Sequence, residues 1–391
     1  MFHSRFIDRI SILRQLDSAA IVAAFAAICY AGYVLPLLRS RHGDISWFVV
    51  AGAAVDATKV PPGLAVRSDI AGYDGVAFYR FAVDPWTRTR SAYGITLDAP
   101  SYRQQRILYP LIVHWLSFGN PEWIPALLVI VNYVAIVILA AFSALLAQRL
   151  GGHALWGVLI VFYPGFLITI SRDLCEIVAC MFAAGAILFV HTRKPVLAAL
   201  FLSLAILTRE TAVILAFGLA AAYTIDRVRK RPQRIAPIAF LLPLGTFVAW
   251  QLTLASWWGI LPFRSAAPLP TMPFVEYVKV LIANSSLRNR ARLYFSEAVF
   301  CGASVILGLL AWRRRREPFI WRFAWAIYFA LAATLPSDIW SEDIGYMRVM
   351  PDFFMLNATL IIPSARSFRW LAAAMTLTLW YYLAAHTIEF S

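Results

Sequence analysis

The residues best suited to chemistry lie in one polar stretch, residues 72–110, within an otherwise strongly apolar sequence. Asp74 stands near its start, and Arg103 and Arg106 stand near its end. A carboxylate can accept a proton from a hydroxyl, and guanidinium groups bind phosphate through paired hydrogen bonds. These residue types predict a site that holds a hydroxyl and a phosphate together.

Two interpretations of Asp74 are open. Gly72 and Gly75 flank it closely, so that a substrate or another backbone segment can approach. Asp74 also precedes an amphipathic segment that ends near Val83, and Asp is a common helix N-cap. Asp98, two residues before Pro100, is typical of a turn.

Arg103 and Arg106 are three residues apart, so on a helix they share a face and could contact one phosphate. Alternatively they are lipid-headgroup anchors at the end of an interfacial helix. The neighbouring polar side chains of Tyr102, Gln104 and Gln105 favour the first interpretation.

Further charged residues interrupt apolar segments. Asp173 and Glu176 open a predicted helix, where acids suit the helix dipole, but Glu176 lies deeper among apolar residues. Arg209 and Glu210 lie within an apolar run, where each unpaired charge costs roughly 2.5 to 3.5 kcal/mol. Adjacent residues on a helix diverge, so partners such as Asp173, Glu176 or a ligand phosphate are expected for this pair.

Arg348 begins a late apolar helix. It is either a snorkelling anchor or another phosphate ligand.

The composition excludes a soluble globule. The 391 residues are 61% hydrophobic and only 14% charged, and the mean hydropathy is +0.69. The net charge of +14 could indicate nucleic acid, but the basic residues form short clusters between apolar runs, as in cytoplasmic loops. We therefore predict a polytopic membrane protein without a nucleic-acid partner.

The chain should be an all-α membrane domain. Apolar runs of spanning or near-spanning length lie at about 18–38, 123–147, 154–170, 173–191, 196–225, 236–257, 294–312, 319–335, 349–363 and 368–387. The run at 196–225 is too long for one helix and is split by the charges at 208–211. The expected total is about eleven transmembrane helices.

The positive-inside rule gives the expected topology of this single domain, residues 1–391. Residues 39–105 form a large first extracytoplasmic loop with amphipathic helices, residues 106–118 an interfacial helix, and residues 258–293 a second large outer loop. The amino terminus, which carries Arg5, Arg9 and Arg14, then lies in the cytoplasm with the other basic clusters. The unexplained charges, including Asp74, Arg209 and Arg348, gather at the outer face.

Several of these stretches resemble a known superfamily. They are Tyr73-Asp74-Gly75 on the first outer loop, the Arg106 to Pro110 segment RILYP, the turn from Tyr163 to Glu176, and Thr208-Arg209-Glu210. Together, over residues 1 to about 225, they resemble the GT-C superfamily of integral-membrane glycosyltransferases. They resemble more loosely the GPI and dolichyl-phosphate mannosyltransferases, and also uncharacterised bacterial membrane proteins with the same GYDG and RILYP order.

The resemblance implies an inverting glycosyltransferase of the bacterial inner (plasma) membrane. Its donor would be a polyprenyl-phosphate hexose or pentose, and its acceptor an extracytoplasmic hydroxyl on a glycan, lipid or protein. On this resemblance Asp74 would be the catalytic base. From the placement of charge, we expect Arg103, Arg106, Arg209 and Arg348 to bind the donor phosphate. The remaining residues would bind substrate or orient the arginines: Tyr73, Tyr102, Asp173, Glu176 and Glu210.

Two points stay open. In many members of that superfamily, paired acids on the first loop hold a divalent metal such as Mg²⁺ or Mn²⁺, and this chain has no adjacent pair there. The alternative function is a transporter or lipid flippase, because many helices and intramembrane charges also suit a translocation path. The single interruption at 208–211 and the one-sided charge favour the enzyme.

Overall fold

The computed structural model describes residues 17–265, 271–284, 288–313, 319–341 and 345–389. It is 73% helical, which confirms the all-α fold class. Within the described ranges, the strands β1 (Ser91–Ala92) and β2 (Ile95–Thr96) form one antiparallel hairpin. The predicted cytoplasmic amino terminus, with Arg5, Arg9 and Arg14, lies outside the described residues.

Helices stand at the positions of the predicted apolar runs. The long ones are α2 (Ala19–Ser40), α6 (Ile124–Arg149), α9 (Glu176–His191), α10 (Pro195–Thr208), α11 (Val213–Val228), α12 (Ile238–Trp258), α15 (Arg288–Arg313), α16 (Phe319–Ala333), α19 (Pro351–Ile361) and α20 (Arg366–Glu389). Shorter ones connect them: η2 (Pro121–Trp123), η3 (Ala154–Gly157), α7 (Val158–Val161), α8 (Gly165–Ser171), η4 (Glu210–Ala212), α13 (Pro262–Ser265), α14 (Val275–Asn284), α17 (Ser337–Ser341) and α18 (Gly345–Val349).

Five helices of the described residues are long and apolar enough to cross a membrane. A bent pair, Ala154–Val161 and Gly165–Ser171, would make a sixth if it is one span. Other apolar helices are shorter: α9 has 16 residues and α10 has 14. The chain therefore has several helices suited to a membrane, while the figure of eleven spans stays a prediction.

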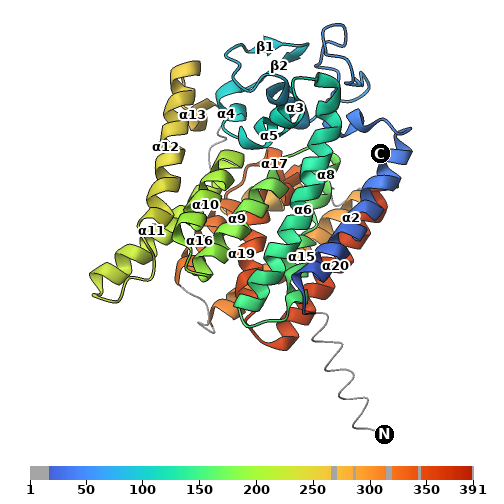
Figure 1. Ribbon diagram of the computed structural model, residues 1–391. Helices are drawn as coiled ribbons and strands as arrows, with labels where there is room; N and C mark the ends of the chain where they lie inside the picture. The colour runs from blue at the N-terminus through green and yellow to red at the C-terminus, as the bar shows by residue number, and fades with distance from the viewer. Residues whose placement is uncertain (1–16, 266–270, 285–287, 314–318, 342–344, 390–391) are drawn as a thin grey trace.

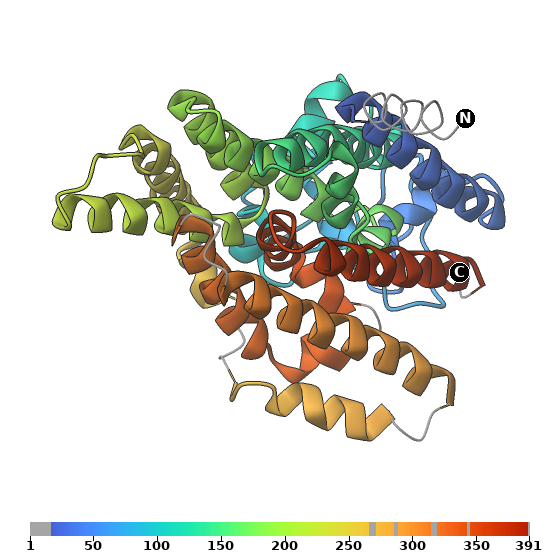
Figure 2. The same cartoon turned by 90° about the horizontal axis from the view of Figure 1, so that it is seen from below.

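The long helices pack as two rows. In one row α2, α6, α9, α10 and α12 contact each other in turn, and in the other α20, α15, α19 and α16 do so. Contacts of α2 with α20, of α9 with α19, and of α11 with both α12 and α16 join the rows. Figure 2 shows the second row along one side of the bundle and the α11–α12 segment projecting at its flank.

The short elements between α2 and η2 cover one end of this bundle (Figure 1). They are η1 (Ile45–Val49), α3 (Gly75–Val83), the hairpin, α4 (Pro100–Gln104) and α5 (Leu108–Leu116). The nine residues of α5 extend about 14 Å, which is too short to cross a bilayer.

The opposite end carries the basic clusters. The C-terminal ends of α6 and α11, the turn between α9 and α10, and the N-terminal end of α20 all lie there (Figure 1). These places hold Arg149, Arg193-Lys194, the basic run at 227–234, and Arg366 with Arg369. The polar first loop and the cationic clusters are thus at opposite ends of the bundle.

Candidate functional site

The carboxylate of Asp74 lies between two guanidinium groups. Its Oδ1 is 2.7 Å from Nη1 of Arg103, and its Oδ2 accepts a hydrogen bond of 2.8 Å from Nη1 of Arg348. Although Asp74 stands at the N-cap of α3, its side chain makes no capping hydrogen bond. Asp74 therefore occupies the predicted N-cap position, but its side chain contacts the arginines and does not cap the helix.

Tight packing brings Arg348 to this place from the far end of the chain. The hydroxyl of Tyr163 donates a hydrogen bond to the carbonyl of Met347, the residue before Arg348. A Cβ on Gly165 would lie 2.7 Å from the same carbonyl oxygen, closer than real Cβ atoms come. The glycine therefore lets the turn before α8 contact α18 directly.

A second glycine positions Asp74 itself. A Cβ on Gly75 would lie 2.5 Å from the carbonyl oxygen of Arg172 and 2.7 Å from that of Val49. The start of α3 thus packs with its backbone against two other segments, and this contact fixes the direction of the Asp74 side chain.

We expect Gly75→Ala to impair the site more than the fold. The added methyl group must push α3 away from Arg172, at a cost of about 1 to 3 kcal/mol in stability, and it moves Asp74 from its arginines. Gly32→Ala in α2 is the matched control, because a Cβ there meets nothing within 4 Å. Thermal unfolding and ligand binding of both variants measure the effect, and an unaltered Gly75→Ala protein would contradict the packing argument.

Arg103 has a second acidic partner that the sequence did not reveal. Asp98 accepts hydrogen bonds of 3.0 Å from Nε and 2.9 Å from Nη2 of Arg103. It also accepts from the backbone N–H of Ala99, directly before α4. Asp98 is therefore part of the site.

Arg106 pairs with Glu210 across the bundle. Two hydrogen bonds of 2.9 and 2.7 Å join them, and Nη2 of Arg106 also donates to the hydroxyl of Tyr102 at 2.8 Å. The pair connects the segment between α4 and α5 to the break between α10 and α11. The predicted split at 208–211 is confirmed, and Glu210 does not pair with its neighbour Arg209.

Arg209 turns instead toward α19. Its Nη2 donates to the carbonyl of Val349 at 2.7 Å, and its Nη1 lies 3.8 Å from Oδ2 of Asp352. Asp352, which also accepts from Thr211 at 2.9 Å, was not predicted as a site residue. Glu176 is also buried, and its charge favours the charged form of Arg209.

Asp173 does not join this group. It is fully buried, neither of its carboxyl oxygens has a hydrogen-bond partner among the described residues, and its charged neighbour is Arg41. Two other polar side chains close to Arg103 in the sequence tie this segment to neighbouring helices. Gln104 accepts a hydrogen bond from the indole N–H of Trp258 in α12, and the hydroxyl of Tyr109 donates a hydrogen bond to the carbonyl of Leu128 in α6.

Burial of Asp74 by itself would raise the pKa of its carboxyl group, but the guanidinium groups of Arg348 and Arg103 outweigh burial. The pKa of Asp74 is therefore lowered. Hydrogen bonds from Arg103 likewise lower the pKa of Asp98. Both acids are ionised at neutral pH, and Asp74 is a weak base while both arginines hold it.

This lowered pKa predicts how stability depends on pH. An acid with a pKa below its usual 3.8 in the folded state stabilises the protein above that value, and the stabilisation is lost as the pH falls further. We expect thermal unfolding of the wild type between pH 6 and about pH 3 to show this loss below about pH 4. Asp74→Asn should lack that component, and parallel curves for the two proteins would contradict the ion pairs.

The acids of the cluster face guanidinium groups. Within the described ranges, no three side chains of His, Cys, Asp or Glu converge as a metal-ligand set.

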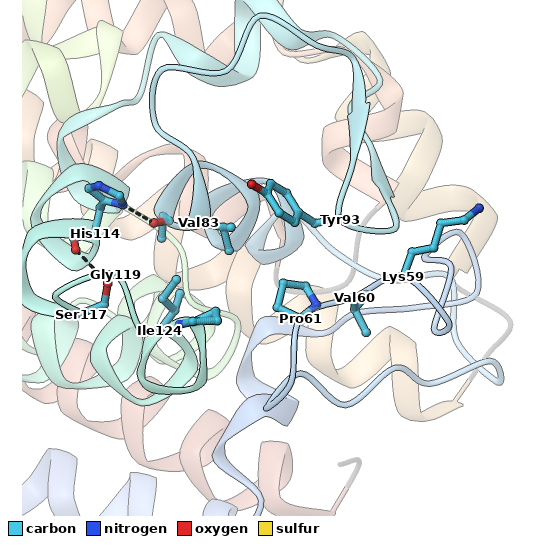
Figure 3. A pocket seen from close by; sticks show the side chains of 11 residues that line it. Lys59, Val60, Pro61, Val83, Tyr93, His114, Ser117, Gly119 and Ile124 are labelled. Atoms are coloured by element: carbon cyan, nitrogen blue, oxygen red, sulfur yellow. Dashed lines mark hydrogen bonds between the residues drawn. The ribbon is translucent and has the colours of Figure 1, made fainter.

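A cavity of about 410 Å³ lies at the C-terminal ends of α3 and α5. Figure 3 shows its wall formed by Pro61, Tyr93, His114 and Ile124. Its lining includes neither Asp74 nor the arginines that contact it.

No protein family, no curated protein and no solved structure matches this chain. The functional proposal therefore rests on the geometry of the site.

Proposed function

We propose that this protein is an inverting glycosyltransferase that moves a sugar from a polyprenyl-phosphate donor to a hydroxyl acceptor. The observation that carries the proposal is the Asp74 carboxylate held between Arg103 and Arg348 at one end of a bundle of apolar helices. An anion of the protein already fills the place that these two guanidinium groups would offer to a phosphate.

The donor phosphate would displace Asp74 from its arginines. Arg103 and Arg348 then bind the phosphate oxygens, and the pKa of the freed carboxylate rises toward its usual value. Asp74 becomes a competent base only when the donor is present. This exchange would keep Asp74 from acting as a base until the donor phosphate has bound to the arginines.

In the reaction, the acceptor oxygen attacks the anomeric carbon while its proton passes to Asp74. The bond between the anomeric carbon and the phosphate oxygen breaks, and polyprenyl phosphate leaves with the electron pair. The arginines stabilise the charge that develops on this phosphate. Glu210 orients Arg106 through their two hydrogen bonds, and Glu176 and Asp352 lie beside Arg209.

The arrangement of charge supports an outer-face site in a bacterial plasma membrane. The basic clusters lie at the end of the bundle opposite the first loop, as the positive-inside rule requires if that loop is extracytoplasmic. The acceptor would be a glycan, lipid or protein at that surface.

A transporter or lipid flippase is the second candidate, and one observation favours it. The pair of helices at 154–171 is bent by 63°, a discontinuity that adds to the turn at 208–212, and transporters commonly bind substrates at two broken helices. The turn between α10 and α11, however, lies at the same end as α4 and α5, to which Arg106 and Glu210 tie it. It therefore lies at one end of the bundle, whereas transporter sites lie near the midplane.

An assay in proteoliposomes distinguishes the glycosyltransferase from the flippase. The purified protein is reconstituted with a labelled polyprenyl-phosphate sugar, and label is followed both into acceptor hydroxyls and across the bilayer. The enzyme predicts loss of sugar from the carrier without transbilayer movement. Movement of intact donor without transfer would support the flippase.

A further inference from the structure

Arg172 is the one arginine at this site without an acidic partner among the described residues. The other four each contact an acid: Arg103 with Asp74 and Asp98, Arg106 with Glu210, Arg209 with Asp352, and Arg348 with Asp74. Arg172 follows α8 and is partly exposed, and no ion pair or side-chain hydrogen bond in the described ranges uses its guanidinium group.

The aromatic ring of Tyr73 places Arg172 beside Arg348. The guanidinium carbon of Arg172 lies 4.3 Å from the ring centroid, and that of Arg348 lies 4.7 Å from it. The two guanidinium carbons are therefore at most about 9 Å apart, both held by cation–π contact. Because the backbone carbonyl of Arg172 also packs on Gly75, the arginine is fixed next to Asp74.

We infer that Arg172 is a further phosphate-binding residue and makes the first contact with the donor. An incoming anion meets no competing carboxylate at Arg172, whereas at Arg103 and Arg348 it must displace Asp74. The phosphate binds Arg172 first and keeps this contact when it reaches Arg348 on the same ring. Arg172 thereby sets affinity for the donor, and Arg348 acts later. This inference rests on the proposed function.

Arg67 offers a matched control. Its guanidinium carbon lies 4.4 Å from the ring of Trp47, also on the first outer loop, but it forms an ion pair with Asp69 at 2.9 Å. The two arginines thus share the aromatic contact and differ in the acidic partner. If an unpartnered charge is what recruits phosphate, only Arg172 should matter.

The test measures binding of geranylgeranyl phosphate to full-length protein in nanodiscs of phosphatidylcholine. We expect Arg172→Gln to raise Kd about tenfold or more, the loss of one charge-assisted hydrogen-bonded contact, while Arg67→Gln leaves it unchanged. Arg172→Lys should retain part of the affinity because it keeps the charge. In transfer assays the KM for the donor should rise while kcat at saturation stays within about twofold. Thermal unfolding confirms that each variant is folded.

The outcomes separate the two claims. Wild-type affinity in Arg172→Gln, with binding by the wild type intact, would overturn the role of Arg172 and leave the proposed function standing. No binding of geranylgeranyl phosphate by the wild type would overturn both. Phosphatidylglycerol added to the nanodiscs distinguishes a lipid headgroup as the ligand: if it competes fully with geranylgeranyl phosphate at Arg172, the residue binds bilayer phosphate and the assignment to the donor fails.

Discussion

Asp74→Asn should abolish sugar transfer and at the same time tighten binding of polyprenyl phosphate. Loss of a general base lowers turnover by about 10² to 10⁴-fold. The amide, however, no longer competes as an anion for Arg103 and Arg348, which contact Asp74 at 2.7 and 2.8 Å. We therefore expect Kd for geranylgeranyl phosphate to fall by about tenfold, or about 1.4 kcal/mol.

The same variant should unfold more readily without ligand. It leaves two mostly buried guanidinium groups without their shared carboxylate, and removal of one partner of a buried pair costs about 3 to 5 kcal/mol. Ligand phosphate should restore much of that stability. Asp69→Asn is the control, because Asp69 pairs with Arg67 on the exposed surface of the same loop. Weaker phosphate binding by Asp74→Asn would contradict the displacement mechanism.

The second large effect should come from Arg106 and Glu210. These side chains are 11% and 21% exposed and are joined by two hydrogen bonds, so Glu210→Gln or Arg106→Gln alone should cost about 3 to 5 kcal/mol of stability. The double variant should cost less than the sum, with a coupling energy of about 1 to 3 kcal/mol. Chemical denaturation of the four proteins gives this coupling.

Transfer activity distinguishes a binding role from a structural one. If Arg106 binds the donor phosphate, the double variant regains stability but not activity. Recovery of both together would show that the pair only holds the fold. Lys59 and Asp56, an exposed pair, should show little or no coupling in the same cycle.

Local sequence pattern was sufficient for the helices. Apolar runs predicted their positions, and the cost of burying Arg209 and Glu210 predicted the break between α10 and α11. The number of spans was harder, because short turns such as the one after α7 divide apolar runs into helices below spanning length. Hydropathy alone does not register such turns.

The site was predicted in composition and only partly in geometry. Asp74, Arg103 and Arg348 were each singled out, but their contact joins segments from opposite ends of the chain and depends on tertiary packing. Asp352 was missed because an acid at the start of a helix after Pro351 fits the helix dipole. In the sequence, Arg172 looks like any cation at the end of a helix. Its position over the ring of Tyr73 is what identifies it as a candidate phosphate-binding residue.

Asp173 shows the opposite error. It lies three residues before Glu176, and the sequence grouped the two as partners for the buried arginine. The backbone of Asp173 has φ of +49°, in the left-handed region, between α8 and α9. Among the described residues its carboxyl oxygens have no hydrogen-bond partner, and it forms no ion pair with Arg209.

The most direct measurement follows labelled sugar from a panel of synthetic polyprenyl-phosphate sugars in membranes that contain either the wild type or Asp74→Asn. The account predicts that the wild type consumes one donor and that Asp74→Asn, folded and able to bind geranylgeranyl phosphate, does not. Consumption of no donor by folded wild-type protein, or equal turnover by both proteins, would contradict it.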